Sequence, residues 1–100
     1  MEKIKITVLR RTINEDFAKK YSKHKIELCP KNTEGQEFIS IDGAKPDNFC
    51  DYAWIDIYKY VFALLFKGNF DMWMRDLSTV ITCCTDGIRP VFYKIERMND

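Results

Sequence analysis

The sequence lacks most of the features from which an activity is usually inferred. It has one histidine, His24, and contains no Walker loop, Rossmann glycine motif, HExxH motif or Ser-His-Asp set. A lone histidine leaves few candidates for general acid–base catalysis. The cysteines form no C-x2-C pair, which is the spacing usual in structural zinc sites. No common enzyme or zinc-finger class is therefore supported by a motif.

The sequence also lacks an excess of charge of one sign and a long hydrophobic run. Its 16 basic and 15 acidic residues give a net charge of +1, which provides no reason to expect nucleic acid as a partner. Residues 1–11 alternate charged and apolar side chains, so we expect no signal peptide. The most apolar stretch, residues 49–66, is interrupted by charges and is not expected to span a membrane. We therefore predict a cytoplasmic protein with reduced thiols.

The residues that are present predict one α+β domain over residues 1–100. Apolar residues make up 46% of the chain and aromatic residues 14%, which is enough for one core without disulfides or a structural metal. Residues 3–10 alternate as in a half-buried strand, and residues 37–41 form a second short strand. Residues 14–21 resemble a short capped helix. A polar loop is expected at residues 22–35.

A longer main helix is expected over residues 48–67. Asn48 resembles its N-cap, because Asp51 follows three residues later as in a capping box. Gly68 and Asn69 supply a left-handed end. Apolar side chains cover more than one stripe of this segment, so we expect one long central helix on which the sheet packs.

Two β-rich runs near the C-terminus predict a hairpin, which completes an antiparallel sheet of about four strands. These runs are residues 79–85 and 89–96. They are joined through Asp86-Gly87, which is a strong hairpin signal. Pro90 has no N–H to donate, so a four-residue loop is favoured over a two-residue loop. Both registers place Cys84 directly opposite Arg89 on one face of the sheet.

The cysteines are the main candidates for chemistry. Cys50 lies at the start of the main helix, where amide N–H groups and the helix dipole would stabilise a thiolate, although a small core residue would fit there equally well. Cys83 and Cys84 are adjacent on a strand and point to opposite faces, so they cannot easily share one metal or one disulfide. Cys29 lies in a loop, where a thiol is accessible and suits a resolving thiol, a metal ligand or no role at all.

Three interpretations of these residues stay open. The first is a cysteine-based site of Cys29, Cys50 and Cys84 that acts through thiol redox chemistry or holds a transition metal such as zinc or iron, with His24 as a fourth ligand. In such a site Arg89 would support a thiolate, and Cys50, Cys84 and Arg89 are the catalytic candidates. We expect the thiols of Cys50 and Cys84 to lie close together, because the helix must pack on the sheet.

The other two interpretations give the cysteines no chemical role. One is a non-catalytic binding module for a small anionic ligand anchored by Arg89, whose planar guanidinium suits a carboxylate or phosphate. Pairing of Arg89 with a nearby aspartate is the simpler alternative. The last interpretation is a structural or interaction domain that uses the apolar surface at residues 70–74. The sequence does not predict the oligomeric state.

Several segments together resemble the signature of a family of small prokaryotic conserved hypothetical proteins. They are Cys29-Pro30, FCDYAW at residues 49–54 and CCTDGIRPV at residues 83–91. The resemblance extends to residues 3–11 and 94–97, and so covers almost the whole chain. It implies a family made of this one domain, with cysteines as part of its pattern. It implies no activity.

Overall fold

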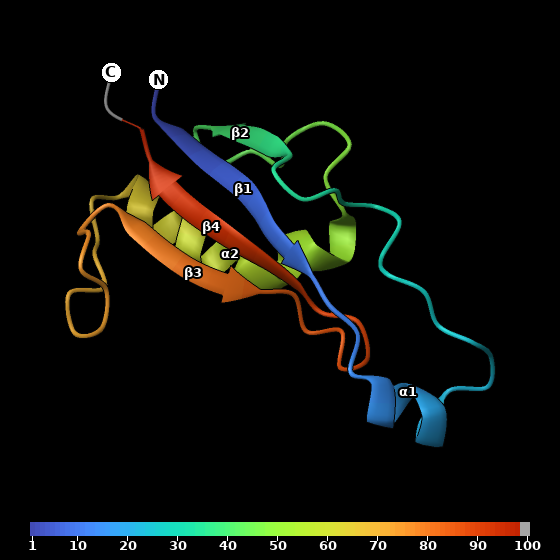
Figure 1. Ribbon diagram of the computed structural model, residues 1–100. Coiled ribbons are helices and arrows are strands. Elements are labelled where there is room, and N and C mark those ends of the chain that lie inside the picture. Colours follow the sequence, from blue (N-terminus) through green and yellow to red (C-terminus); the bar gives the residue numbers. More distant parts are fainter. Residues whose placement is uncertain (99–100) are drawn as a thin grey trace.

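The computed structural model describes residues 1–98. Its elements are β1 (Lys3–Arg11), α1 (Glu15–Tyr21), β2 (Glu37–Ile41), α2 (Asp51–Leu65), β3 (Thr79–Cys83) and β4 (Val91–Arg97). The strands form one antiparallel sheet in the order β2-β1-β4-β3, and α2 lies across one face of it (Figure 1). The predicted α+β class and the four-stranded antiparallel sheet are confirmed. None of the helices within residues 1–98 is long and apolar enough to cross a membrane.

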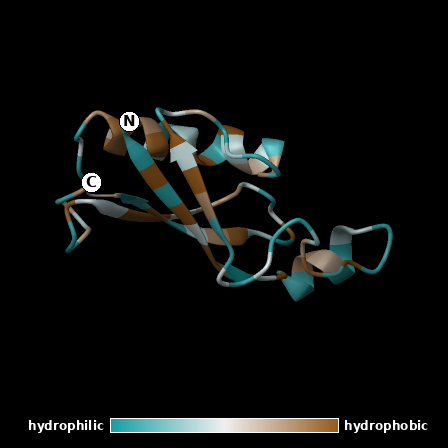
Figure 2. Cartoon of the chain, turned by 90° about the horizontal axis from the view of Figure 1, so that it is seen from above, coloured by the Kyte–Doolittle hydropathy of each residue, from teal (hydrophilic) through white to brown (hydrophobic). Residues whose placement is uncertain are grey.

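The core lies between the sheet and α2. Strands bury every second side chain, because successive side chains point to opposite faces. Bands of hydrophobic and hydrophilic residues accordingly alternate along the strands (Figure 2). The fully buried apolar residues of the strands are Ile4, Ile6, Val8, Val80, Val91, Tyr93 and Ile95. Those of α2, at helical spacing, are Ile57, Val61 and Leu64.

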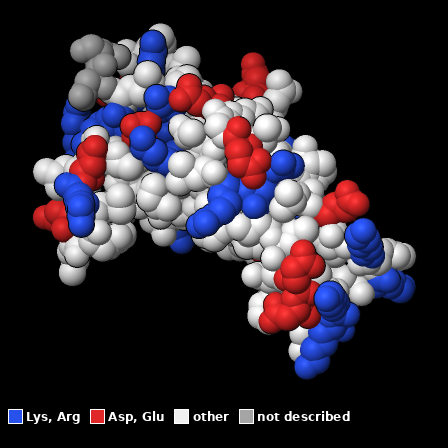
Figure 3. Space-filling model, in the orientation of Figure 1, with Lys and Arg blue, Asp and Glu red and all other residues white. Residues whose placement is uncertain are grey.

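Helix α1 projects from the body of the domain beyond the end of β1 (Figure 1), and none of its residues is buried. Asn14 is not the side-chain cap that the sequence predicts. Its side chain instead donates to the Gly87 carbonyl at 2.8 Å, and its N–H donates to the Ile88 carbonyl at 2.7 Å. Positive and negative side chains are mixed over this projection (Figure 3), so it presents no field of one sign.

Helix α2 begins later than the sequence predicts, and Cys50 rather than Asn48 is its N-cap. Asn48 has a φ of 64°, outside the helical region. The next residue, Phe49, is only 3% exposed, and its ring lies 4.9 Å from that of Phe38 and 5.6 Å from that of Tyr93. Burial of Phe49 therefore requires the chain to turn before the helix can start.

The other end of α2 closes with a Schellman motif. The N–H of Gly68 donates to the Ala63 carbonyl at 2.8 Å, and the N–H of Lys67 donates to the Leu64 carbonyl at 3.1 Å. Lys67 is the left-handed residue, with a φ of 67°. A Cβ on Gly68 would lie 2.7 Å from the Ala63 carbonyl oxygen. Glycine is therefore needed at position 68 for close approach, one residue after the left-handed position.

The prediction of one long central helix is not confirmed. Helix α2 has 15 residues and covers one face of the sheet, so its outer side has no layer above it. Ile57 and Val61 on the inner side are fully buried, whereas Ile55 and Phe62 on the outer side are 74% and 49% exposed. Apolar residues all round this helix thus do not mean burial all round.

The register predicted for the hairpin is wrong. Cys83 pairs with Phe92, and the N–H of Cys84 donates to the Val91 carbonyl at 3.0 Å, so Cys84 faces Val91 rather than Arg89. A shift of two residues moves no side chain to the other face, because the side-chain period of a strand is also two. Cys84 therefore keeps its predicted position on the face that carries α2.

The wider β3–β4 connection has its own hydrogen bonds. The carboxylate of Asp86 accepts the N–H groups of Ile88 and Arg89 at 2.9 and 3.0 Å, which closes a local turn. The Pro90 carbonyl accepts both the N–H and the hydroxyl of Thr12, at 3.1 and 2.8 Å. These bonds satisfy the connection without further strand pairing, which explains why the ladder ends before Arg89.

Residues 70–74 form a single helical turn, as the sequence suggested. The N–H of Met74 donates to the Phe70 carbonyl at 2.8 Å. Phe70 and Met74 pack against the core, while Met72 and Trp73 are exposed. The apolar surface at this turn is therefore limited to two side chains.

Candidate functional site

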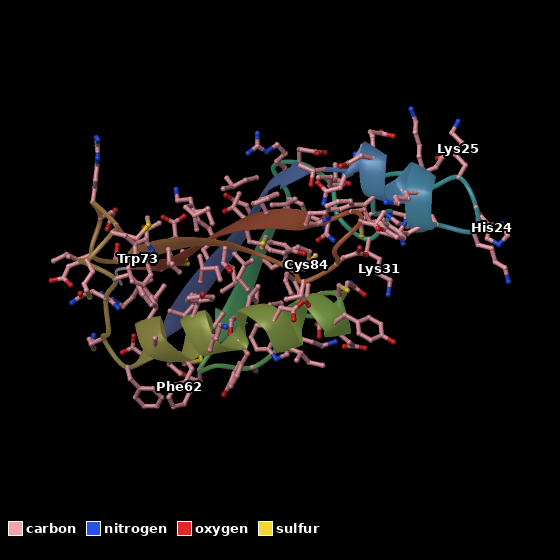
Figure 4. The ribbon with its side chains drawn as sticks, turned by 90° about the horizontal axis from the view of Figure 1, so that it is seen from below. His24, Lys25, Lys31, Phe62, Trp73 and Cys84 are labelled. Carbon is pink, nitrogen blue, oxygen red and sulfur yellow. The ribbon has the colours of Figure 1, made fainter. Side chains whose placement is uncertain are left out.

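A pocket opens between the start of α2 and the end of the sheet formed by β3 and β4. Its volume is about 450 Å³. Three segments that are distant in the sequence form its walls, namely residues 29–32, the first turns of α2 and the β3–β4 connection. Cys84 and Lys31 come from two of these segments and lie beside the start of α2 (Figure 4).

Three of the four cysteines line this pocket. Cys29 comes from the loop before β2, Cys50 is the N-cap of α2, and Cys84 directly follows β3. All three are free thiols that are partly buried and pack against the core. The structure thus brings together the cysteines that the sequence analysis grouped. Their action as one site stays a prediction.

Cys83 is different from the other three cysteines. It precedes Cys84 on the strand and therefore points to the opposite face of the sheet. Burial raises the pKa of the Cys83 thiol, and the negative charges of Cys84 and Asp56 raise it further. Cys83 is therefore a protonated thiol at neutral pH and a suitable control for the pocket cysteines.

Arg89 also lines the pocket, but it does not rely on a ligand for a partner. Its Nε lies 3.7 Å from the Asp86 carboxylate, and its NH1 group donates to the Glu27 carbonyl at 3.3 Å. The side chain is about one-third exposed. A guanidinium carries five N–H donors, and these contacts use only part of that capacity. Arg89 is thus held in place and still able to bind an anion.

A pair of hydrogen bonds ties the β3 end to α2. The carboxylate of Asp56 accepts the N–H and the hydroxyl of Thr85, both at 2.8 Å. Asp56 lies in the second turn of α2, and Thr85 directly follows Cys84. This contact fixes the distance between the two walls of the pocket.

A second set of contacts holds the loop that carries Cys29. Asn32 is only 3% exposed; its Oδ1 accepts the Tyr93 hydroxyl at 3.2 Å, and its Nδ2 lies 3.7 Å from the Cys29 sulfur. NH1 of Arg11 donates to the Cys29 carbonyl at 3.2 Å. The loop is therefore attached to β4 through Asn32 and to β1 through Arg11.

Tyr93 lines the pocket together with the three thiols. Burial raises the pKa of the Tyr93 hydroxyl, and the negative charges of Cys84, Cys50 and Cys29 raise it further. The hydroxyl therefore stays protonated and keeps donating to Asn32. A tyrosine at the pocket base that cannot ionise also adds no charge that would oppose a thiolate.

The pocket does not fit a metal centre as it stands. Within residues 1–98, no three His, Cys, Asp or Glu side chains are grouped closely enough to hold one metal ion. His24, the expected fourth ligand, lies in the loop after α1, far from Cys84 (Figure 4). Zinc or iron binding by Cys29, Cys50 and Cys84 therefore stays a prediction without support from this geometry.

Comparison with known proteins adds nothing to the geometry. No protein-family model, curated protein or solved structure matches this chain. The resemblance to a family of small prokaryotic proteins stays a prediction, as does the cytoplasmic location. The function must therefore be argued from the pocket itself.

Sequence reasoning missed two residues of the site, Asn32 and Tyr93. Tyr93 alternates with Val91 and Ile95 on a buried strand face, and a buried tyrosine hydroxyl needs a partner. The sequence could therefore have predicted that a polar side chain from another segment packs against β4 at Tyr93. Nothing in the sequence around Asn32 marks it as that partner, since the contact joins residues 61 positions apart.

We predict that Tyr93→Phe destabilises the protein by about 1–2 kcal/mol, because it leaves the buried Asn32 amide without its partner. Tyr21→Phe, which alters an exposed tyrosine of α1, should change stability by less than about 0.5 kcal/mol. Urea unfolding of both variants checks this. Equal effects of the two substitutions would show that the Tyr93–Asn32 bond contributes nothing.

Proposed function

We propose that the protein carries out thiol–disulfide chemistry in this pocket on a small anionic substrate. The observation that supports it most is the convergence of Cys29, Cys50 and Cys84, from three distant segments, on one pocket beside Arg89. Such a group of unbonded thiols next to a fixed positive charge is typical of reactive cysteine sites. In this proposal Cys50 attacks, Cys29 resolves, and Arg89 holds the substrate.

Cys50 is the attacking thiol because of its place in the fold. It is the N-cap of a 15-residue helix, whose first amide N–H groups have no partner within the helix. These groups and the helix dipole stabilise a negative charge. The carboxylate of Asp51 would oppose this effect, but Lys45 donates a hydrogen bond to it and lowers its pKa. The opposing charge is thus largely compensated.

Cys29 is the resolving thiol because side-chain contacts, rather than a strand ladder, hold its loop. It lies in a stretch without helix or strand between α1 and β2. Cys84, by contrast, is fixed at the end of β3: its N–H donates to the Val91 carbonyl, and its sulfur accepts the Val91 N–H at 3.3 Å. A disulfide between Cys50 and Cys29 therefore needs a shift of the loop alone.

The proposed reaction has two steps. The Cys50 thiolate attacks one sulfur of a small disulfide, which breaks the S–S bond, forms a mixed disulfide and releases the first thiolate. Cys29 then loses its proton to solvent and attacks the Cys50 sulfur, which releases the second thiolate. The protein ends with a Cys29–Cys50 disulfide, and the substrate has been reduced to two thiols.

Two basic side chains in the pocket are the reason for proposing an anionic substrate. Arg89 and Lys31 both line it, and a guanidinium binds a carboxylate or phosphate with two parallel hydrogen bonds. Two acidic side chains, Asp56 and Asp86, also line the pocket. Their oxygens accept hydrogen bonds from Thr85 and from the Ile88 and Arg89 N–H groups, so the unused N–H donors of Arg89 and Lys31 are the groups left to bind a substrate. The same features would serve a binding module without chemistry, which is the second candidate function.

We predict that a small disulfide oxidises the reduced protein to a Cys29–Cys50 disulfide, seen by peptide mapping. Cys29→Ser should stop the reaction at a mixed disulfide on Cys50, since the resolving thiol is missing. Cys50→Ser should abolish it. Cys83→Ser is the control and should react like the unaltered protein, because Cys83 points away from the pocket.

Two results would contradict this assignment. One is a mixed disulfide that persists in the unaltered protein, because resolution would then not occur. The other is equal modification of all four cysteines, because no thiol would then be specially reactive. Either result would leave anion binding as the function better supported.

We predict that Arg89→Lys lowers the rate with a dicarboxylate disulfide about tenfold, as expected for the loss of one charge-assisted hydrogen bond worth about 1.5 kcal/mol. The rate with the neutral hydroxyethyl disulfide should change by less than about twofold, because that substrate makes no ion pair. Stopped-flow measurement of both rates tests it. An equal loss with both disulfides would show that Arg89 supports the thiolate or the fold instead.

A further inference from the structure

The outer side of α2 carries a row of apolar side chains, with the exposed Lys59 among them, that no other element within residues 1–98 covers. It is formed by Tyr52, Ile55, Tyr58, Phe62 and Phe66, which we call the outer α2 face and which are between 40% and 78% exposed. Single exposed apolar residues are common on proteins. A contiguous apolar surface along a helix marks an interface, and a helix that is apolar all round is normally buried.

The rings of this surface are already ordered against one another. Tyr58 lies 6.1 Å from Phe62, and Phe62 lies 4.8 Å from Phe66, measured between ring centroids. Residues four positions apart lie on the same face of a helix, so the rings form a ladder along it. Because the rings already pack against each other, binding of a partner would cost little further side-chain entropy.

We propose that a second copy of this chain covers the outer α2 face, with the two α2 helices antiparallel. The charges at the two ends of α2 and the direction of its dipole favour this occupant. The acidic residues of the helix, Asp51 and Asp56, lie in its first half, whereas Lys59 follows and Lys67 closes the C-terminal end. In an antiparallel pair centred near Lys59, Lys67 of one copy lies beside Asp51 of the other, and the two helix dipoles are opposed. A parallel pair would place like charges together.

The size of the surface agrees with a self-association. With about 200 Å² for each aromatic side chain, the exposed part of the outer α2 face offers about 600 Å² on each copy. Two copies would bury about 1,200 Å², which is at the lower end of the range for specific interfaces. Two-fold symmetry needs only one self-complementary surface, and the outer α2 face meets that condition.

The dimer would complete the pocket described above. Tyr52 belongs both to the outer α2 face and to the pocket wall. In an antiparallel pair, the C-terminal end of the partner helix lies beside the N-terminal end of the first. The partner's Phe66 would then pack near Tyr52 and cover the outer edge of the pocket. This inference does not depend on which chemistry the thiols perform.

The test is sedimentation equilibrium of the reduced protein from about 1 to 100 μM, the range of weak to moderate complexes. We expect a species of twice the 11.9 kDa chain mass. Phe62→Asp should weaken the dimer by more than about 30-fold, as for a central interface residue. Phe17→Asp is the matched control, because Phe17 of α1 is 48% exposed and Phe62 is 49% exposed; it should leave the dimer intact.

The orientation is tested by a photocrosslinking amino acid at position 66. We expect crosslinks to the peptide of the second copy that contains Tyr52 and Ile55. Crosslinks confined to the C-terminal end of the partner helix would contradict the antiparallel arrangement. A protein that stays monomeric at 100 μM, or a dimer that Phe62→Asp and Phe17→Asp affect equally, would overturn the proposal.

Discussion

The pocket depends on one packing interaction, the insertion of Phe49 between the sheet and the start of α2. Phe49 contacts the rings of Phe38, Trp54 and Tyr93, and a buried aromatic side chain of this kind contributes several kcal/mol. Because the chain must turn to bury Phe49, the N-cap of α2 lies two residues after Asn48, the cap that the sequence predicts. Cys50 thereby becomes the N-cap, and its thiol lies at the positive end of the helix dipole and lines the same pocket as Tyr93, Cys29 and Cys84.

The remaining contacts keep these walls in place without a covalent bond. Asp56 joins α2 to the β3 end, and Asn32 joins the Cys29 loop to Tyr93. Each contact joins one loop of the pocket wall to a regular element: Thr85 is bound to α2, and Asn32 is bound to β4. The thiols can therefore stay reduced and separate while their segments are held together. A site that forms and breaks disulfides needs this property, since its frame must be stable in both states.

The sequence predicted the elements of the fold better than the contacts between them. The strands at residues 3–10 and 37–41 and the short helix before Tyr21 follow from alternation and capping, which are local signals. The start of α2 was misplaced because Asn48 has the side chain of a cap, whereas burial of the next residue is a tertiary effect. The predicted pairing of Cys84 with Arg89 failed because Asp86 and Thr12 satisfy the connection, and neither contact has a local signature. Cys50 and Cys84 were expected on the same side of the sheet because this needed only the faces of the elements, and a register error of two residues leaves those unchanged. The position of Cys29, in a loop, had no such basis.

The outer α2 face and the pocket meet at Tyr52, so the proposed dimer and the proposed thiol chemistry would share one edge of the molecule. The central claim is that the thiols of this pocket act as a pair rather than as separate core residues. The most direct measurement is the equilibrium oxidation of the protein in buffers of defined dithiol-to-disulfide ratio, followed by intact mass. We predict that the folded protein, without denaturant, shows one two-electron transition in which its mass falls by two hydrogen atoms. The dithiol-to-disulfide ratio at the midpoint should be the same whether or not a low concentration of denaturant is present. A protein that keeps all four thiols across the whole series, or that oxidises only once it is unfolded, would contradict the account.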